Sequence, residues 1–280
     1  MLFAATTNTV KYFFVGGTGQ ALTADSTNYY GAYGGTLSAQ TTETTVQGLV
    51  RVGGTLSNLQ ANISTNARNS NSSASSRVNT GPGNQTITIT ALTTGLFEDT
   101  TNSDTVASGD LINHNFATGN DAGSGNTVTF RFIAGAFTTT GLAYGILQGV
   151  AGRTIAAGAT RFLHLGGVTT ESSTELDTEA TTNQAFTLSN LIMKAITNSQ
   201  TTDTVLTSRV GAGPGAMTVT LTANTTGTFE DTTNSDSLTA TSLINTQIIV
   251  GTGGTFTYTY QSALATLPTT ATGNFFIMMM

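Results

Sequence analysis

The sequence predicts an all-β protein made of two tandem antiparallel β-sandwich domains with jelly-roll topology. Three observations lead to this prediction: a long internal repeat, a composition rich in Thr and Gly, and short segments in which apolar and polar residues alternate. Charged residues make up only 9% of the 280 residues, against about 25% in ordinary soluble domains. Thr is β-branched and suits strands, whereas the helix formers Glu and Lys are nearly absent.

The internal repeat relates the two halves of the chain by 132 residues. The eight residues FEDTTNSD occupy 97–104 and return at 229–236. The same offset relates further pairs: TLSNL at 55–59 and 187–191, Thr42-Glu43 and Thr174-Glu175, Arg77-Val78 and Arg209-Val210, G-P-G at 81–83 and 213–215, and LIN at 111–113 and 243–245. A repeat of this length is a domain with its own core. We therefore expect one domain in 1–137 and a second in 138–280, joined by a short connector at 135–141.

The offset falls to 128 near the end of each copy, where NTVTFRF (126–132) resembles GTFTYTY (254–260). We place a four-residue deletion in the loop that precedes this last strand of the second copy. Each copy has about 130 residues, which is enough to bury a core without disulfides. The chain has no Cys, so a disulfide framework and a thiolate metal site are both excluded.

Alternating residues locate the strands and the core. QTITIT (85–90) and AMTVTLT (216–222) alternate apolar residues with Thr, and TVTFRF and TFTYTY do the same near the end of each copy. Further strands are expected at 10–15, 45–52, 56–64, 74–78 and 111–117, with counterparts in the second copy, and the G-P-G tripeptides are expected to form turns. The predicted core residues are Ile87, Ile89, Val128, Phe130, Phe132, Val219, Leu221, Phe256, Tyr258 and Tyr260, with the alternating Thr residues exposed.

The repeated FEDTTNSD motif has two interpretations. Its oxygen-bearing side chains, Glu98, Asp99, Asn102 and Asp104, with Glu230, Asp231, Asn234 and Asp236 in the second copy, are of the type that binds calcium. The spacing is not that of an EF-hand, because the turn Gly and the closing Glu are missing. The second interpretation, which we prefer, is a structured loop whose Asp and Asn side chains bind nearby backbone amides while Phe97 or Phe229 enters the core.

Other chemistry-bearing residues form no recognisable constellation, so we expect no enzyme and assign no catalytic, cofactor-binding or metal-binding residue. His114 and His164 do not correspond under the repeat, and His114 is interpreted as a surface or hydrogen-bonded strand residue. Paired carboxylates occur only inside the repeated motif. The stretch Tyr29-Tyr30-Gly31-Ala32-Tyr33 is the best candidate for a sugar-stacking platform, although a loop that packs on its neighbours is favoured.

Charge and hydropathy disfavour two kinds of partner. The net charge is -6, the pI is near 4.7 and the 9 basic residues are scattered, which is unlike a nucleic-acid-binding surface. The apolar runs, including FFIMMM at 275–280, are too short to span a membrane. The N-terminal residues lack the basic and apolar regions of a secretion signal, so classical secretion is not expected. We expect neither a nucleic acid nor a membrane as partner.

The repeated segments at 55–117 and 187–249 resemble the jelly-roll domains of phage and environmental viral structural proteins. The resemblance lies in TLSNL, a Thr/Ser/Asn-rich hairpin, Arg-Val with a Gly-rich turn, a T-x-T-x-T strand, TTG-x-FEDTTNSD and LIN. It implies a virion component with tumour-necrosis-factor-like or capsid-like jelly rolls. The second copy departs from the first in having TATSLIN in place of ASGDLIN.

The expected function is therefore that of a non-enzymatic structural protein of a phage-like virion, as a capsid, decoration, fibre or tail component that acts through self-assembly. It would be assembled in the host cytoplasm and then released in the virion. Expected partners are other copies, as a trimer or a ring, other virion proteins, and a host-surface glycan or receptor. The segment before Gly34 and the tail at 275–280 are expected to take part in assembly. The alternative is a secreted or cell-surface adhesin or filament subunit.

Overall fold

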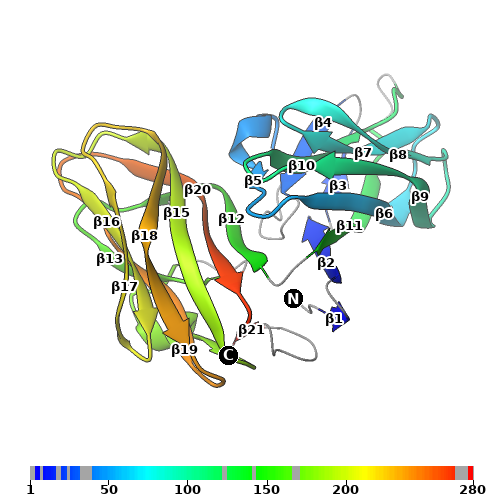
Figure 1. Ribbon diagram of the computed structural model, residues 1–280. Coiled ribbons are helices and arrows are strands. Elements are labelled where there is room, and N and C mark those ends of the chain that lie inside the picture. Colours follow the sequence, from blue (N-terminus) through cyan, green and yellow to red (C-terminus); the bar gives the residue numbers. More distant parts are fainter. Residues whose placement is uncertain are drawn as a thin grey trace. The chain divides into compact units, whose positions relative to one another are not determined.

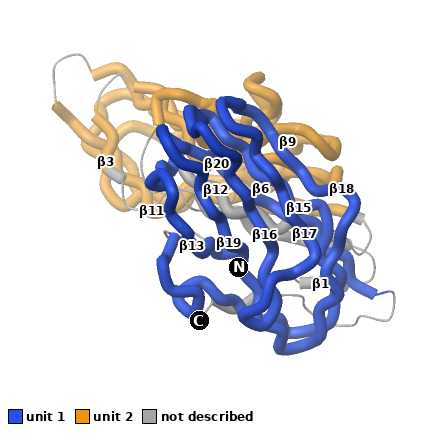
Figure 2. The backbone as a smooth tube through the Cα atoms, turned by 90° about the vertical axis from the view of Figure 1, so that its left-hand side faces the viewer, with its two compact units in different colours: residues 1–8, 141–280 blue, residues 9–140 orange. Residues whose placement is uncertain are grey.

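The protein consists of two compact β units. The computed structural model describes residues 4–6, 9–16, 20–23, 26–31, 40–121, 125–140, 143–165, 171–268 and 277–279. One unit comprises Thr9–Thr140, and the other comprises Gly141–Met280 together with Met1–Asn8 (Figure 2). Each unit is described by itself below.

The first unit is a sandwich of two antiparallel sheets (Figure 1). One sheet has the order β2-β11-β6-β9 with β3 beside β11, and the other has the order β4-β10-β7-β8 with β5 beside β10. The elements are β2 (Thr9–Gly16), β3 (Gln20–Leu22), β4 (Thr27–Gly31), the 3-10 turn η1 (Glu43–Thr45), β5 (Gly48–Leu49), β6 (Gly54–Asn66), β7 (Ser72–Val78), β8 (Gly81–Ile89), β9 (Gly95–Val106), β10 (Leu111–Ala117) and β11 (Val128–Thr140). Strand β1 (Ala4–Thr6) belongs to the segment Met1–Asn8 of the other unit.

The strand pairs of this unit are nested one inside another. β2 pairs with β11, β4 with β10, β6 with β9, and β7 with β8. Two further pairs, β11 with β6 and β10 with β7, join these hairpins into sheets. A long hairpin whose arms pair from the ends inward and then wrap into two sheets is a jelly roll.

The second unit repeats this arrangement. Its sheets have the orders β12-β20-β15-β18 and β17-β16-β19-β14-β21, with β13 beside β19. The nested pairs are β12 with β20, β13 with β19, β15 with β18 and β16 with β17. The elements are β12 (Ala143–Ile155), β13 (Thr160–Leu163), η2 (Glu175–Thr178), β14 (Ala180–Thr182), β15 (Phe186–Asn198), β16 (Thr204–Val210), β17 (Gly213–Leu221), β18 (Gly227–Leu238), β19 (Leu243–Ile249), β20 (Phe256–Thr266) and β21 (Ile277–Met279).

The division between the units lies after Thr140, whereas the sequence prediction placed it after residue 137. The predicted connector at 135–141 needs correction, because Gly135–Thr140 are the end of strand β11. These residues pair in register with Phe14–Thr9 of β2. The Gly and Thr residues that suggested a linker thus belong to the sheet, and residue 141 lies outside the described residues.

Nine of the predicted core residues are buried and Phe132 is not. Ile87, Ile89, Val128 and Phe130 belong to one buried cluster of the first unit, and Phe130 packs against the rings of Tyr30 and Phe116. The buried second-unit residues are Val219, Leu221, Phe256, Tyr258 and Tyr260. Phe132 is only half-buried, because Arg131 is an extra residue in the ladder: Phe130 pairs with Ile63, and Phe132 pairs with the adjacent Asn62. After this bulge Ile133 takes the core position.

Two further sequence expectations are wrong in detail. Thr257 and Thr259 of β20 are buried rather than exposed, since β20 lies between β12 and β15, and the hydroxyl of Thr257 shares a hydrogen bond with Thr154 (2.8 Å). The G-P-G tripeptides do not form the turns. The turns are Asn79-Thr80 and Gly211-Ala212, all with φ between 51° and 68°, the type I′ hairpin geometry. Pro82 and Pro214 instead lie in the edge strands β8 and β17, where a missing N–H is tolerated.

The bulge in β11 predicts unequal effects for two neighbouring aromatic residues. Phe130→Ala should lower the free energy of unfolding by about 3–5 kcal/mol, because it leaves a cavity in the core. Phe132→Ala should cost clearly less, since that ring is only half-buried. Denaturant unfolding of the two variants measures the difference. Equal losses would contradict the bulged register.

Candidate functional site

The repeated FEDTTNSD motif forms part of an edge strand in each unit. It lies within β9 in the first copy and within β18 in the second, so the prediction of a loop is wrong. The strand is interrupted, however: Ser57 pairs with Ser103 and Leu59 with Asp99, so three residues of β9 oppose the single Asn58. Asn58 has a φ of 52°, and its counterpart Asn190 has a φ of 53°. The motif is therefore a large β-bulge rather than a connection between strands.

Asp99 holds this bulge in shape. Its Oδ1 accepts hydrogen bonds from the backbone N–H groups of Thr101 (3.1 Å) and Asn102 (3.0 Å) and from the Thr101 hydroxyl (3.2 Å). The Asn102 side-chain amide donates to Oδ2 (2.9 Å). Asp231 accepts the same bonds from Thr233 and Asn234. The prediction that the motif's Asp side chains bind nearby backbone amides is thus confirmed.

The same carboxylate also reaches the other sheet of the sandwich. The backbone N–H of Thr86 in β8 donates to Asp99 Oδ2 (2.9 Å), and that of Thr218 in β17 donates to Asp231 Oδ2 (2.8 Å). β8 and β17 are edge strands, whose outward N–H groups lack a neighbouring strand. Each Asp therefore supplies an acceptor that the sheet itself does not provide.

Asp104 makes a second link between the sheets. It accepts hydrogen bonds from the Asn84 N–H (2.5 Å), the Ser76 hydroxyl (2.6 Å) and the Gln85 side-chain amide (2.9 Å). In the second copy Asp236 accepts from the Ala216 N–H (2.6 Å) and the Ser208 hydroxyl (2.6 Å). Asp104 and Asp236 are buried, at 3% and 8% exposure. Two carboxylates per unit thus join the edge strands of opposite sheets.

The third residue of each G-P-G leaves room for this carboxylate. A Cβ atom on Gly83 would lie 2.8 and 2.9 Å from the two carboxylate oxygens of Asp104 and closer still to the Ser76 hydroxyl. Gly215 has the same neighbours in Asp236 and Ser208. Real Cβ atoms essentially never approach other atoms so closely. The repeated Gly is therefore required by the close approach of the carboxylate, not by a turn.

The calcium interpretation of the motif has no support in this geometry. Glu98 and Glu230 are exposed, whereas the adjacent Asp99 and Asp231 are buried on the opposite face of their strand. The Asp oxygens accept N–H and O–H donors, which a cation would have to displace. Among the described residues no group of three or more His, Cys, Asp or Glu side chains is placed to hold a metal.

Hydrogen bonding keeps the Asp99 and Asp231 carboxyls ionised. Burial alone would raise the pKa of Asp99, but the bonds from Asn102, Thr86 and Thr101 outweigh it and hold the pKa well below its usual range. The pKa of Asp231 is lowered in the same way by Asn234, Thr218 and Thr233. Both carboxyls accept hydrogen bonds from neutral donors, which is a structural role.

A second repeated arrangement joins Glu43 to Arg77. The guanidinium donates to both Glu43 oxygens (2.6 and 2.9 Å) and also to the Thr80 carbonyl, and its carbon lies 5.6 Å from the centre of the Tyr29 ring. Arg209 binds Glu175 (2.7 and 2.7 Å) and lies 5.6 Å from the Phe162 ring. Both pairs occupy positions that repeat in the sequence, but the repeat alone does not show that they contact each other. A paired Arg over an aromatic ring stabilises the turn that precedes β8 and β17.

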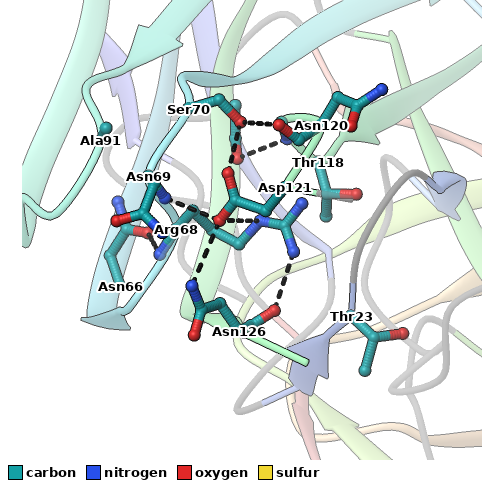
Figure 3. A network of polar contacts seen from close by, with 12 residues as sticks. Thr23, Asn66, Arg68, Asn69, Ser70, Ala91, Thr118, Asn120, Asp121 and Asn126 are labelled. Atoms are coloured by element: carbon teal, nitrogen blue, oxygen red, sulfur yellow. Dashed lines mark hydrogen bonds and ion pairs between the residues drawn. The ribbon is translucent and has the colours of Figure 1, made fainter. Parts of the chain in front are cut away.

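Among the described residues, one polar network occurs in the first unit and has no equivalent in the second. Arg68 is fully buried, and its Nε atom lies 3.7 Å from Oδ2 of Asp121 (Figure 3). The same guanidinium donates a hydrogen bond to the Asn126 carbonyl (2.8 Å). Asp121 also accepts from the Asn69 N–H (2.7 Å) and the Ser70 hydroxyl (2.8 Å). The second copy has Gln200 in place of Arg68, and Gln200 donates to the Gly254 carbonyl (2.8 Å). The network therefore secures the loop before β11, which is longer in the first copy.

Both histidines are buried, although His114 was expected to be a surface or hydrogen-bonded strand residue. His114 is 2% exposed, pairs in the sheet with Tyr30 and Ser76, and has no hydrogen bond on either ring nitrogen among the described residues. The expectation of an exposed or hydrogen-bonded His114 is thus wrong. Burial lowers its pKa from 6.5 to about 4, against the opposing effect of Asp104. Burial also lowers the pKa of His164.

The suggested sugar-stacking platform does not present its rings to solvent where the structure describes them. Tyr30 is fully buried against Phe130, and burial raises the pKa of its hydroxyl. Tyr29 lies under Arg77. Ala32 and Tyr33 lie outside the described residues.

Comparison with known proteins gives little. No protein-family model matches the sequence, and no curated protein matches it. A solved xanthan lyase from Paenibacillus matches with a TM-score of 0.26 and 16% identity, over 88% of this chain and 23% of the lyase. The chain therefore spans less than a quarter of that neighbour's length. A TM-score this low carries no argument about fold or activity. Among the described residues, no helix has the length and apolar character to cross a membrane.

The close approach of Gly83 to Asp104 gives a test with an internal control. Gly83→Ala should lower the free energy of unfolding by about 1–3 kcal/mol, because the methyl group displaces a buried carboxylate. Gly81→Ala is the matched control, since a Cβ there meets only the Val78 carbonyl at 3.3 Å. Urea unfolding of both variants decides the point. A Gly83→Ala protein as stable as Gly81→Ala would show that the carboxylate contact is unimportant.

The lowered pKa values predict a loss of stability in acid. A carboxyl whose pKa is lower folded than unfolded stabilises the fold above its unfolded pKa of about 3.9, and this contribution is lost as the pH falls below that value. The double variant Asp99→Asn/Asp231→Asn should be less stable than the wild type at neutral pH. Its free energy of unfolding should also fall less between pH 5 and pH 3, an interval that extends about one pH unit on either side of the unfolded pKa.

Urea unfolding across this pH range measures the effect. Glu98→Gln is the control for the loss at neutral pH, because Glu98 is the exposed neighbour of Asp99. An acid dependence in the double variant as steep as in the wild type would contradict the assignment to these two carboxyls.

Proposed function

We propose that the protein is a non-enzymatic structural component of a phage-like virion and acts through self-assembly. One observation supports this most: the repeated Asp residues and the repeated Glu-Arg pair make their contacts within the fold. Asp99 and Asp104 link the sheets, Glu43 binds Arg77, and the second copy repeats each contact. The duplication has therefore preserved a scaffold rather than a reactive site. Two rigid sandwiches in one chain are suited to a building block.

The exposed faces of the edge strands add to this proposal. Thr86 and Thr88 lie on the solvent side of β8, and Thr218 and Thr220 lie on that of β17. Thr90 and Thr222, directly after these strands, are exposed as well. Desolvating a hydroxyl costs much less than desolvating Lys or Glu, and its hydrogen bonds are re-formed easily with a partner. Surfaces of this kind can form contacts between copies that salt does not weaken, because screening acts on charges.

The partners in this proposal are other copies of the chain and other proteins of the same particle, with a host-surface glycan or receptor as an external ligand. The place of action is the virion, which is assembled in the host cytoplasm and then released. The protein would act as a capsid, decoration, fibre or tail component, depending on which of its surfaces binds the other proteins of the particle. The resemblance of the segments at 55–117 and 187–249 to viral jelly-roll domains is the basis for choosing a virion.

The proposal predicts salt-resistant association. The purified full-length protein should form a closed symmetric homo-oligomer, with a trimer or a ring expected, and its mass should be unchanged when the salt concentration is raised. Sedimentation or light scattering over a range of protein and salt concentrations measures this. A chain that stays monomeric at high concentration, and that is missing from purified particles, would contradict a structural role. Binding to glycans by the monomer would instead favour an adhesin.

A further inference from the structure

The C-terminal strand β21 extends the edge of a sheet in the second unit. Ile277, Met278 and Met279 pair antiparallel with Thr182, Thr181 and Ala180 of β14. On its other side β14 pairs with β19. Of the tail at 275–280 that is expected to take part in assembly, the described residues 277–279 form a strand that fills the edge of β14. This is strand addition, in which main-chain hydrogen bonds hold an extended segment against a sheet edge.

The first unit contains the same edge. Strand β5 is the counterpart of β14 under the 132-residue repeat, and the two make identical contacts: Leu49 pairs with Leu111 as Thr181 pairs with Leu243, and Gly48 pairs with Ile112 as Ala180 pairs with Ile244. The hydrogen bonds at the next position also match. Val50 bonds to Asp110 and Gly109 (both 2.8 Å), and Thr182 bonds to Ser242 and Thr241 (3.1 and 2.8 Å).

The outer side of β5 is without a paired strand among the described residues. In this part of the chain β5 pairs with β10 alone, whereas β14 pairs with both β19 and β21. Alternate residues of a strand direct their backbone groups to opposite sides. Because Gly48 and Val50 bond toward β10 and its preceding turn, Leu49 presents its N–H and C=O outward, as Thr181 does toward Met278.

The chain connectivity explains why no donor strand is seen beside β5 in the part of the first unit that the structure describes. With the offset of 128 that holds for the end of each copy, the counterpart of Ile277–Met279 is 149–151. These residues belong to β12, the first long strand of the second unit, where Gly149 pairs with Tyr260. The segment that follows the first copy is therefore committed to the second sandwich. The described residues of each chain thus include two equivalent acceptor edges and one strand, β21, that fills such an edge.

We propose that β5 is an acceptor edge for the C-terminal strand Ile277–Met279 of a second copy of this chain. The inference rests on the proposed self-assembly and names one of its contacts. The donor leaves β14 of its own chain and pairs with β5 of another, in the register that places Met278 opposite Leu49. As in domain swapping, one set of main-chain hydrogen bonds replaces an equivalent set. The donor and acceptor are different surfaces, so repetition of the contact gives a ring or a filament.

Disulfide trapping tests this contact, because the natural chain has no Cys. The single variants Leu49→Cys and Met278→Cys are prepared separately, mixed, and oxidised. Residues directly opposite in an antiparallel pair lie within the Cα separation that a disulfide spans, about 4.4–6.8 Å. The expected product is a peptide joining positions 49 and 278, identified by mass spectrometry after proteolysis. It can arise only between two chains, since each chain carries one of the two cysteines.

The control mixes Met278→Cys with Thr88→Cys, whose cysteine lies on the exposed face of β8. A 49–278 peptide without an 88–278 peptide supports the proposal. Equal amounts of the two would reveal random collision and would overturn it. A full-length protein that associates, as measured by its mass, but yields no 49–278 peptide would overturn strand exchange and leave self-assembly standing. A monomer with no cross-link would overturn both.

A second variant guards against a cysteine that disturbs folding. Leu49→Pro removes the outward N–H of β5, and Pro is tolerated in edge strands. It should reduce the mass of the wild-type oligomer toward that of the monomer while the thermal unfolding transition of the chain is kept. Thr181→Pro is the matched variant in β14. It removes the N–H that faces Met278 of the same chain, so it should favour pairing of β21 with β5 of another copy. A Leu49→Pro protein that unfolds and associates like the wild type would overturn the proposal.

Discussion

The carboxylates of Asp99 and Asp104, and their counterparts in the second unit, are the contacts on which each sandwich depends. A jelly roll has a corner where consecutive strands β8 and β9 belong to opposite sheets, so no backbone ladder joins them. The Thr86 and Asn84 N–H groups at this corner donate to the two carboxylates instead. This closes the sandwich edge and removes donors that would otherwise pair with another chain. Three local features position these carboxylates: the bulge in β9, Asn58 at positive φ opposite it, and Gly83, which leaves room for Asp104.

The strands could be predicted from the sequence because their signal is local. Ile87 and Ile89 alternate with Thr, and the alternation alone assigns each residue to a face. The prediction was wrong where a residue's surroundings come from distant parts of the chain. FEDTTNSD has the composition of a loop, yet its Asp residues bind amides of a neighbouring strand. Phe132 follows the alternation and still leaves the core, because the pairing with β6 introduces a bulge that its own sequence does not encode.

The site was predictable only in part for a related reason. The repeat showed that Glu43, Arg77 and Gly83 matter in both copies, but not that Glu43 contacts Arg77 or that Gly83 lies against Asp104. Such contacts join residues tens of positions apart, and a single sequence carries no record of which ones meet. Arg68 and His114 gave even less signal, because each occurs in one copy alone and is buried by its neighbours. Burial of a charge or an imidazole is decided by the tertiary fold.

Duplication of a domain copies every edge, but the segments that follow the two copies can take different places in the fold. In this protein the strand that follows the first copy becomes β12, whereas the one that follows the second copy remains as β21. The edges β5 and β14 are equivalent in their hydrogen bonds, and β14 is the one with a strand on both sides. An edge without a partner exposes main-chain groups that bind any complementary strand. Unlike the β8 corner, where side chains satisfy the edge within the unit, the β5 edge carries no such carboxylate among the described contacts. Among its described residues the chain therefore has two equivalent acceptor edges for one donor strand. In the proposed exchange the donor moves from β14 of its own chain to β5 of another copy, so one set of main-chain hydrogen bonds replaces an equivalent set and the two pairings compete on nearly equal terms.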